Sequence, residues 1–161
     1  AAFSVGIWAK ATGYSTSQTT FLLAKRNFSV AQSEYQFARV SATGKLNFSI
    51  FSGGGTSAYI TRLSSSTLSN SGHGWKHLVC TYDGSETASG IKIYVDGVDD
   101  LGTTSTTGTY TGLSNTATPL IFGGWIDSSN RSLYGDWDAP FYANRELTAT
   151  EAATIYQEGR R

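Results

Sequence analysis

The stretch from residue 75 to residue 97, WKHLVCTYDGSETASGIKIYVDG, constrains the fold more than any other part of the chain. Hydrophobic residues dominate 78–82, and residues 91–95 alternate between apolar and polar, a period of two that is typical of a half-buried strand. Asp-Gly follows each run, and this pair favours tight turns because glycine adopts positive φ without steric cost. The stretch therefore predicts an antiparallel hairpin followed by a second reversal.

The rest of the chain repeats this pattern at short intervals, with turn residues between most of the runs. Such spacing favours two sheets packed face to face, because each sheet must bury one face. Strands are predicted at 3–9, 20–24, 35–40, 45–51, 58–63, 77–82, 91–95, 120–123 and 134–142. The residues predicted to be buried are Trp8, Leu78, Cys80, Ile93, Val95 and Phe122.

Two segments depart from the strand pattern. The glycine-rich residues 52–56 predict a turn, and the Thr/Ser/Gly-rich residues 102–118 are expected to arch over one sheet. Within 35–40, Tyr35, Phe37 and Arg39 share a face that is not purely apolar, so we expect it to front solvent or a ligand.

One helix is predicted, at 148–158. Thr148 and Glu151 have the T-x-x-E spacing of a capping box, in which each side chain satisfies a free backbone N–H of the first turn. Gly159 is a suitable stop.

Four segments, in order, resemble the laminin G-like branch of the concanavalin A-like lectin folds. Residues 75–97 resemble its W-x-H-x-x-x-T-Y-D-G and I-Y-V-D-G motifs, and 135–147, GDWDAPFYANREL, resembles its closing segment. FSVGIWAKA and LIFGG lie where the family has an early and a late strand. The resemblance implies an all-β, two-sheet antiparallel jelly-roll sandwich with one short C-terminal helix, forming a single domain over residues 1–161.

Pro140 departs from the family pattern, and it predicts a bulge or an unpaired position in the last strand because proline donates no ladder hydrogen bond.

Composition excludes several classes of function. The chain of 161 residues has 12 basic and 12 acidic side chains, so its lack of net charge gives no electrostatic basis for nucleic-acid binding. Without a run of about 20 apolar residues, no membrane insertion is expected. A chain that begins at Ala1 and contains no Met predicts a module that is excised from, or part of, a larger protein. Its polar, weakly charged composition resembles extracellular β-rich modules, which predicts an extracellular, cell-surface or virion-surface location.

No catalytic motif of the enzymes that share this sandwich is present. Retaining glycosidases of the fold carry E-x-D-x-x-E on one strand, because nucleophile and acid must lie on one side about 5 Å apart. None of the glutamates has that spacing, and the basic and histidine strand motifs of polysaccharide lyases are also missing. His73 and His77 have no partner in metal spacing. The chain is therefore not expected to be an enzyme.

The candidate binding site lies in 125–137, WIDSSNRSLYGDW, where aromatic and polar side chains are mixed. Flat aromatic faces suit the C–H side of a pyranose, and amide, carboxylate and guanidinium groups bond its hydroxyls. The alternative is that the aromatic rings cover the edge of the core. The predicted ligand-binding residues are Trp125, Asp127, Asn130, Arg131, Tyr134 and Trp137.

The resemblance also implies a possible structural calcium ion, since many relatives bind one through loop carboxylates and backbone carbonyls. Asp138 matches the family's last-strand aspartate and is the expected metal ligand. Aspartate is also common in turns without any metal, because its side chain bonds nearby backbone groups.

These observations favour a non-catalytic binding module that recognises carbohydrate or a glycoconjugate. The first alternative is a protein-adhesion or structural module of a larger extracellular or virion protein. The second is a polysaccharide-active enzyme. Exposure of Trp125, Tyr134 or Trp137 as a platform distinguishes the first two, because fold alone does not fix function.

Overall fold

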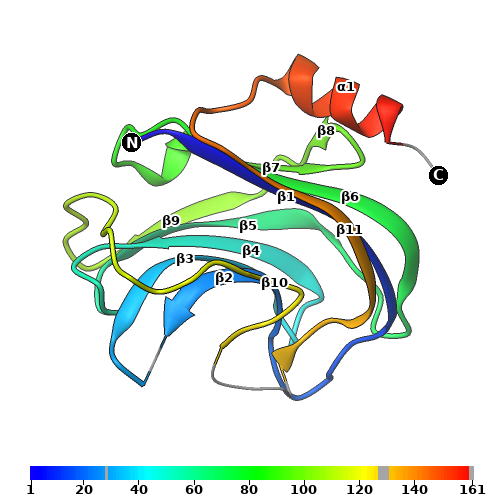
Figure 1. Ribbon diagram of the computed structural model, residues 1–161, viewed down its shortest axis with the longest axis horizontal. Coiled ribbons are helices and arrows are strands. Elements are labelled where there is room, and N and C mark those ends of the chain that lie inside the picture. Colours follow the sequence, from blue (N-terminus) through cyan, green and yellow to red (C-terminus); the bar gives the residue numbers. More distant parts are fainter. Residues whose placement is uncertain (28, 127–130, 160–161) are drawn as a thin grey trace.

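The computed structural model describes residues 1–27, 29–126 and 131–159, whose strands form two antiparallel sheets packed face to face (Figure 1). The β1 sheet has the order β11 (Tyr134–Ala143), β1 (Phe3–Gly13), β6 (His73–Tyr82), β7 (Ile91–Val95) and β8 (Val98–Asp99). The β2 sheet has the order β10 (Ile121–Phe122), β2 (Thr20–Asn27), β3 (Gln32–Arg39), β4 (Lys45–Phe51), β5 (Tyr59–Thr67) and β9 (Thr103–Thr107). A 3₁₀ turn, η1 (Ala88–Gly90), and one helix, α1 (Ala149–Glu158), complete the described elements. The predicted fold class is confirmed.

The core lies between the two sheets and is built from alternate residues of their strands. Phe3 of β1 packs edge-on against Phe48 of β4, with ring centroids 6.1 Å apart. Leu78, Cys80 and Ile93 are fully buried there, as predicted. Burial raises the pKa of the Cys80 thiol, so this side chain is a packing group rather than a reactive one.

Val95 and Phe122 are less buried than predicted. Both are half-buried and pack against the core cluster rather than lying inside it. Val95 is the last residue of β7, and Phe122 belongs to the short edge strand β10. Residues at a strand end or at a sheet edge have neighbours on fewer sides, so part of each side chain stays in contact with solvent.

Trp8 is buried as predicted, but on the outer face of the β1 sheet. Its indole is 4% exposed and lies beneath α1, 5.8 Å from the Tyr156 ring and 5.0 Å from the His77 ring. The helix therefore covers a second, smaller apolar layer on the far side of the β1 sheet (Figure 1). Burial lowers the pKa of His77, which keeps this ring uncharged within the stack.

The predicted capping box begins α1. The Thr148 hydroxyl accepts a hydrogen bond from the Glu151 N–H at 3.2 Å, and the Glu151 carboxylate accepts one from the Thr148 N–H at 2.8 Å. At the other end, the Gly159 N–H bonds the Ile155 carbonyl. A Cβ at Gly159 would lie 2.8 Å from the Trp8 indole, so glycine lets the helix end lie close to that ring.

Two local features follow the sequence closely. Asp96 and Gly97 both adopt positive φ, 52° and 78°, and turn the chain from β7 into β8. In β11 the register against β1 shifts between Gly6 and Trp8, where Ala139 and Pro140 together face a single residue of β1. The bulge predicted from Pro140 is confirmed.

Sequence reasoning assigned the wrong face of β3 to solvent. Tyr35 and Phe37 point into the core, and Arg39 beside them is only 1% exposed. The Arg39 guanidinium lies 4.6 Å over the Tyr14 ring and donates to the Leu68 carbonyl at 3.0 Å. A buried arginine with an aromatic partner and a carbonyl acceptor explains how a mixed face can belong to a core.

Residues 102–118 contain a strand that was not predicted. β9 pairs with β5 as the edge of the β2 sheet, and its side chains are exposed. The chain then crosses the molecule toward β10 (Figure 1), and Leu113 and Leu120 pack against the core. Within the described residues, no helix is both long and apolar enough to cross a membrane.

Candidate functional site

Four polar residues lie side by side across neighbouring strands of the β2 sheet. Gln36 of β3 pairs with Ser49 of β4, Ser49 with Thr61 of β5, and Thr61 with Ser105 of β9. Their neighbours along β3 and β4, and Ile60 along β5, are core residues, so the side chains of this row point to the opposite face of the sheet. The outer face of the β2 sheet is therefore polar along this row.

This face is hollowed. The cavity, which we call the outer hollow, has a volume of about 440 Å³. That volume is within the range of small-molecule sites, which combine apolar walls with a few placed polar groups. Its walls come from β2 to β5 and the adjoining segments, and comprise Thr19, Arg26, Gln36, Val40, Asn47, Ser49, Phe51, Thr56, Tyr59 and Thr61.

Hydrogen bonds fix the polar floor of the outer hollow. The Asn47 amide donates to Thr61 Oγ1 at 2.9 Å, and Ser49 Oγ donates to Asn47 Oδ1 at 2.6 Å. Ser49 Oγ and Thr61 Oγ1 are also 3.0 Å apart, and Thr61 Oγ1 donates to the Phe48 carbonyl at 3.0 Å. Because each group holds the next in place, the floor presents its remaining donors and acceptors in one arrangement.

Among the described lining residues, one carries a positive charge, Arg26. The Arg26 side chain donates to Gln36 Oε1, and its guanidinium lies 4.6 Å from the centre of the Phe51 ring and 5.9 Å from that of Trp125. Burial, together with the charge of Arg131, lowers the pKa of Arg26 to about 10, so it stays cationic at neutral pH. A fixed guanidinium between aromatic rings suits planar, bidentate recognition of polar groups.

The predicted residues Trp125 and Arg131 lie next to this wall. The Trp125 ring meets the Phe21 ring edge-on at 4.9 Å, and the Arg131 guanidinium lies 5.3 Å from the Trp125 centroid. Trp125 is half-buried, so one part of its ring covers the small apolar cluster around Phe21 while another part is accessible. Arg26 thus connects this predicted rim to the outer hollow.

The other predicted binding residues are placed differently. Tyr134 and Trp137 belong to β11 of the β1 sheet and are 49% and 48% exposed, and neither lines the outer hollow. Trp137 stacks on Phe122 with ring centroids 6.4 Å apart. Asp127 and Asn130 lie outside the described residues.

Among its described lining residues, the outer hollow has no pair of carboxylates of the kind that glycoside hydrolysis needs. Its lining includes one guanidinium and one phenol, but no carboxylate and no imidazole among the described residues. A glycosidase needs a pair of carboxylates on either side of the scissile bond. The arrangement can therefore bind a polyhydroxylated ligand, and its described residues include no acid and base couple of that type.

The calcium ion at Asp138 stays a prediction. In the described part of the chain, no three His, Cys, Asp or Glu side chains are grouped to hold a metal. Asp138 Oδ1 accepts a hydrogen bond from the Ala139 N–H at 2.6 Å, and the nearby Asp136 pairs with Lys10 at 3.6 Å. The calcium prediction thus depends on Asp138 and the family resemblance.

Thermal unfolding tests the calcium prediction. If Asp138 helps to hold an ion, added calcium should raise the melting temperature by mass action on the native state, and a chelator should lower it. The Asp138→Asn variant should lose this response, while Asp136→Asn on the same strand should keep it. If the wild type gives superimposable melting curves with calcium and with chelator, the prediction of a structural calcium ion is wrong.

Sequence reasoning did not find the outer hollow, although one signal was present. Gln36 alternates with core residues in β3, as Asn47 and Ser49 do in β4, and this is a clean pattern of polar residues on one face. That pattern identifies a polar face. It does not tell which strands lie next to each other, and the hollow depends on that order.

Family and structure comparisons agree with this architecture. The laminin G-type family model of the concanavalin A-like lectin/glucanases superfamily matches residues 1–153. A comparison with curated protein sequences finds no match.

Three solved structures illustrate the similarity of fold. The binding domain of Paraclostridial Mosquitocidal Protein 1 has a TM-score of 0.67 at 15% identity, over 98% of this chain and 37% of its own. A candidate carbohydrate-binding protein from Bacteroides ovatus has a TM-score of 0.65 at 15% identity, over 94% of this chain and 40% of its own. Domain 4 of AbnA, an extracellular arabinanase from Geobacillus stearothermophilus, was solved with arabinotriose and has a TM-score of 0.63 at 20% identity, over 96% of this chain and 66% of its own. In each case the chain spans less than two thirds of the solved chain.

Proposed function

The chain belongs to the concanavalin A-like lectin/glucanases superfamily, and we propose that it is a non-catalytic module that binds carbohydrate on the outer face of its β2 sheet. The observation that carries this proposal is the fixed polar floor of Asn47, Ser49 and Thr61 beside the Arg26 guanidinium and its aromatic partners. Amide, hydroxyl and guanidinium groups bond sugar hydroxyls, and the Phe51 and Tyr59 rings in the same walls offer apolar surface for the C–H side of a sugar ring.

The predicted residues next to the outer hollow extend this site. Trp125 and Arg131 act as its outer contacts, and Asp127 and Asn130 form further hydrogen bonds with sugar hydroxyl groups. Tyr134 and Trp137 are proposed as a separate aromatic contact on β11, since their half-exposed rings can meet a ligand or a partner. The proposed setting is extracellular or surface-exposed, with the module as one part of a larger protein.

Affinity at one site should be modest. Each sugar hydroxyl exchanges a bond with water for one with the protein, so the net gain is about 1 kcal/mol per hydrogen bond. Several copies of the module, or several repeats of the glycan, would then supply avidity.

A glycan array followed by calorimetric titration tests this proposal. The array identifies a ligand, and arabinotriose is added as a defined probe because a protein of this fold was solved with it. Asn47→Ala and Trp125→Ala should each weaken binding about tenfold, the equivalent of one lost hydrogen bond or stacking contact. Asn144→Ala, which removes an exposed amide directly after β11, is the matched control and should bind like the wild type.

The outcomes separate the alternatives. Loss of binding in Tyr134→Ala or Trp137→Ala, with Asn47→Ala unaffected, would move the sugar site to β11. If no glycan binds on the array or in the titrations, the adhesion or structural role is favoured instead.

A further inference from the structure

A second cavity lies on the opposite side of β2 from the outer hollow. Its volume is about 490 Å³, and we call it the edge slot because residues from β2, β3, β11 and the 113–120 segment line it. Lys25 lines the edge slot, and the next residue of the same strand, Arg26, lines the outer hollow. The two linings share no residue, and Tyr35 of the edge slot belongs to the core between the sheets, so the two cavities are separate.

The edge slot contains a carboxylate with one oxygen already occupied. Glu34 is 3% exposed, and Oε1 accepts hydrogen bonds from Lys25 Nζ at 2.5 Å, from the Thr116 N–H at 2.6 Å and from the Thr116 hydroxyl at 2.8 Å. Within the described part of the chain, every hydrogen bond to this carboxylate ends on Oε1. The other oxygen, Oε2, is therefore available to accept a donor from a ligand.

The charge of Glu34 is balanced, which restricts the ligand. Lys25 Nζ directs its three protons to Glu34 Oε1 and to the Thr116 and Thr118 carbonyls, at 2.5, 3.0 and 2.8 Å. The ion pair is thus complete without a ligand. A free cation would find its attraction to Glu34 offset by Lys25, whereas a neutral hydroxyl can donate to Oε2 without adding charge.

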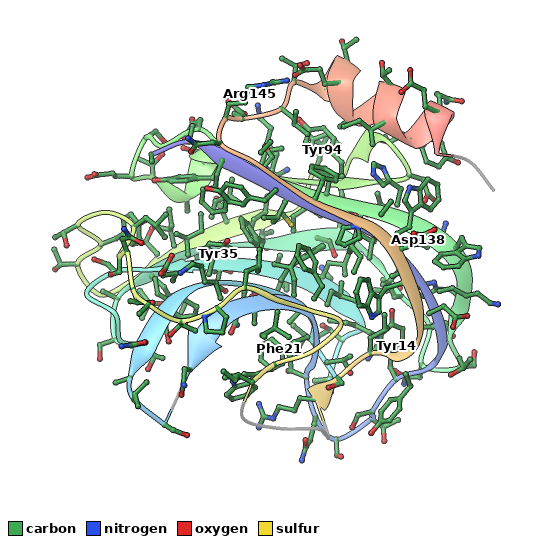
Figure 2. The ribbon with its side chains drawn as sticks, viewed as in Figure 1. Tyr14, Phe21, Tyr35, Tyr94, Asp138 and Arg145 are labelled. Atoms are coloured by element: carbon green, nitrogen blue, oxygen red, sulfur yellow. The ribbon has the colours of Figure 1, made fainter. Side chains whose placement is uncertain are left out.

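The walls of the edge slot supply apolar surface and further polar atoms. Tyr142 is 51% exposed, and its ring stacks on Phe3 with centroids 6.1 Å apart, which holds it as a platform at the mouth. Tyr35, which lies between the two sheets (Figure 2), lines the cavity together with Leu113 and Leu120. Asn115 adds an exposed amide.

We infer that the edge slot is a second carbohydrate site, which takes one neutral sugar unit with its apolar face on Tyr142 and a hydroxyl donating to Glu34 Oε2. This site is independent of the outer hollow, so it does not require the proposed function to be correct there. A module with two such sites would bind two glycan chains, or two places on one chain.

The test is a methyl and amide NMR titration with single sugars: D-glucose, D-galactose, D-mannose and L-arabinose, each added separately. At least one sugar should shift the methyl resonances of Leu113 and Leu120. Tyr142→Ala should weaken that binding about tenfold through loss of the stacking surface. Asn144→Ala is the matched control, since this residue directly follows β11, is exposed and does not line the slot.

Two further variants test whether the sugar binds in the edge slot rather than elsewhere. Asn115→Ala, at an exposed position, should also weaken the binding, even if Tyr142→Ala alters the edge strand. Asn47→Ala should leave it unchanged, which separates this site from the outer hollow. The inference is overturned if none of the four sugars shifts the Leu113 and Leu120 methyls, or if Tyr142→Ala and Asn115→Ala both bind like the wild type.

Discussion

Replacing Trp8 by alanine should lower the free energy of unfolding by about 3 to 5 kcal/mol, the range for truncating a large buried aromatic side chain. The indole is 4% exposed and is enclosed by His77, Tyr156 and the end of α1 at Gly159. Its removal leaves a cavity between the helix and the β1 sheet that these neighbours fill only in part. Urea unfolding followed by circular dichroism measures the change.

Trp137→Ala is the control for this prediction. Trp137 is 48% exposed and stacks on Phe122, so the same truncation removes less buried surface and should cost clearly less. If Trp8→Ala unfolds at the same urea concentration as the wild type, α1 does not depend on this indole and the packing described here is wrong.

Asp100→Ala should be the second strongly destabilising change, with a loss of about 2 to 3 kcal/mol because a buried, charged acceptor disappears from several donors. The carboxylate is buried and accepts the Ser65 N–H at 2.5 Å, the Ser65 hydroxyl at 2.8 Å and the Ser66 N–H at 3.1 Å. It also accepts from the Ser66 hydroxyl. These bonds tie the end of β5 to the segment after β8.

Asp99→Ala is the matched control next in the chain. Asp99 pairs with Arg62 at 3.4 Å but is partly exposed, and Arg62 keeps two backbone carbonyl acceptors without it. Such a pair contributes about 0 to 1 kcal/mol. Equal losses for the two variants would contradict the role given to Asp100.

The Asp100 effect should depend on pH in a defined direction. Burial alone raises the pKa of the Asp100 carboxyl, but hydrogen bonds from Ser66 and Ser65 outweigh it and hold the pKa below its usual value. A carboxyl with a lowered folded pKa stabilises the protein above its unfolded pKa, about 3.9, and loses that contribution as pH falls through the folded pKa. The gap between wild type and Asp100→Ala should therefore be constant near neutral pH and shrink in acid.

Most of the fold could be predicted from sequence because its signals are local. The Asp-Gly turn at Asp96, the capping box of Thr148 and Glu151, and the bulge at Pro140 each act within a few residues, and all three are confirmed. β9 was missed because its Thr-rich run carries no apolar alternation, and it is a strand because β5 offers it an unpaired edge.

The candidate site could be predicted only at its rim. Trp125 and Arg131 are close together in the sequence, so the mixture of aromatic and polar side chains could be recognised there. The structure places both residues beside Arg26. The hollow itself draws residues from four strands, and Gln36 meets Ser49 and Thr61 only through the sheet register. Likewise, the mixed face of Tyr35 and Arg39 looked exposed because the aromatic partner of Arg39 is distant in sequence.

An NMR titration that reports directly on the outer face of the β2 sheet tests the central claim. The ¹⁵N-labelled protein is titrated with the best ligand from the glycan array, and the side-chain amides of Gln36 and Asn47 are followed together with Arg26 Nε. The account predicts that these three groups show the largest shifts and that they saturate with one affinity. A ligand that binds and shifts resonances of β11 or α1, while Gln36, Asn47 and Arg26 stay unchanged, would contradict it.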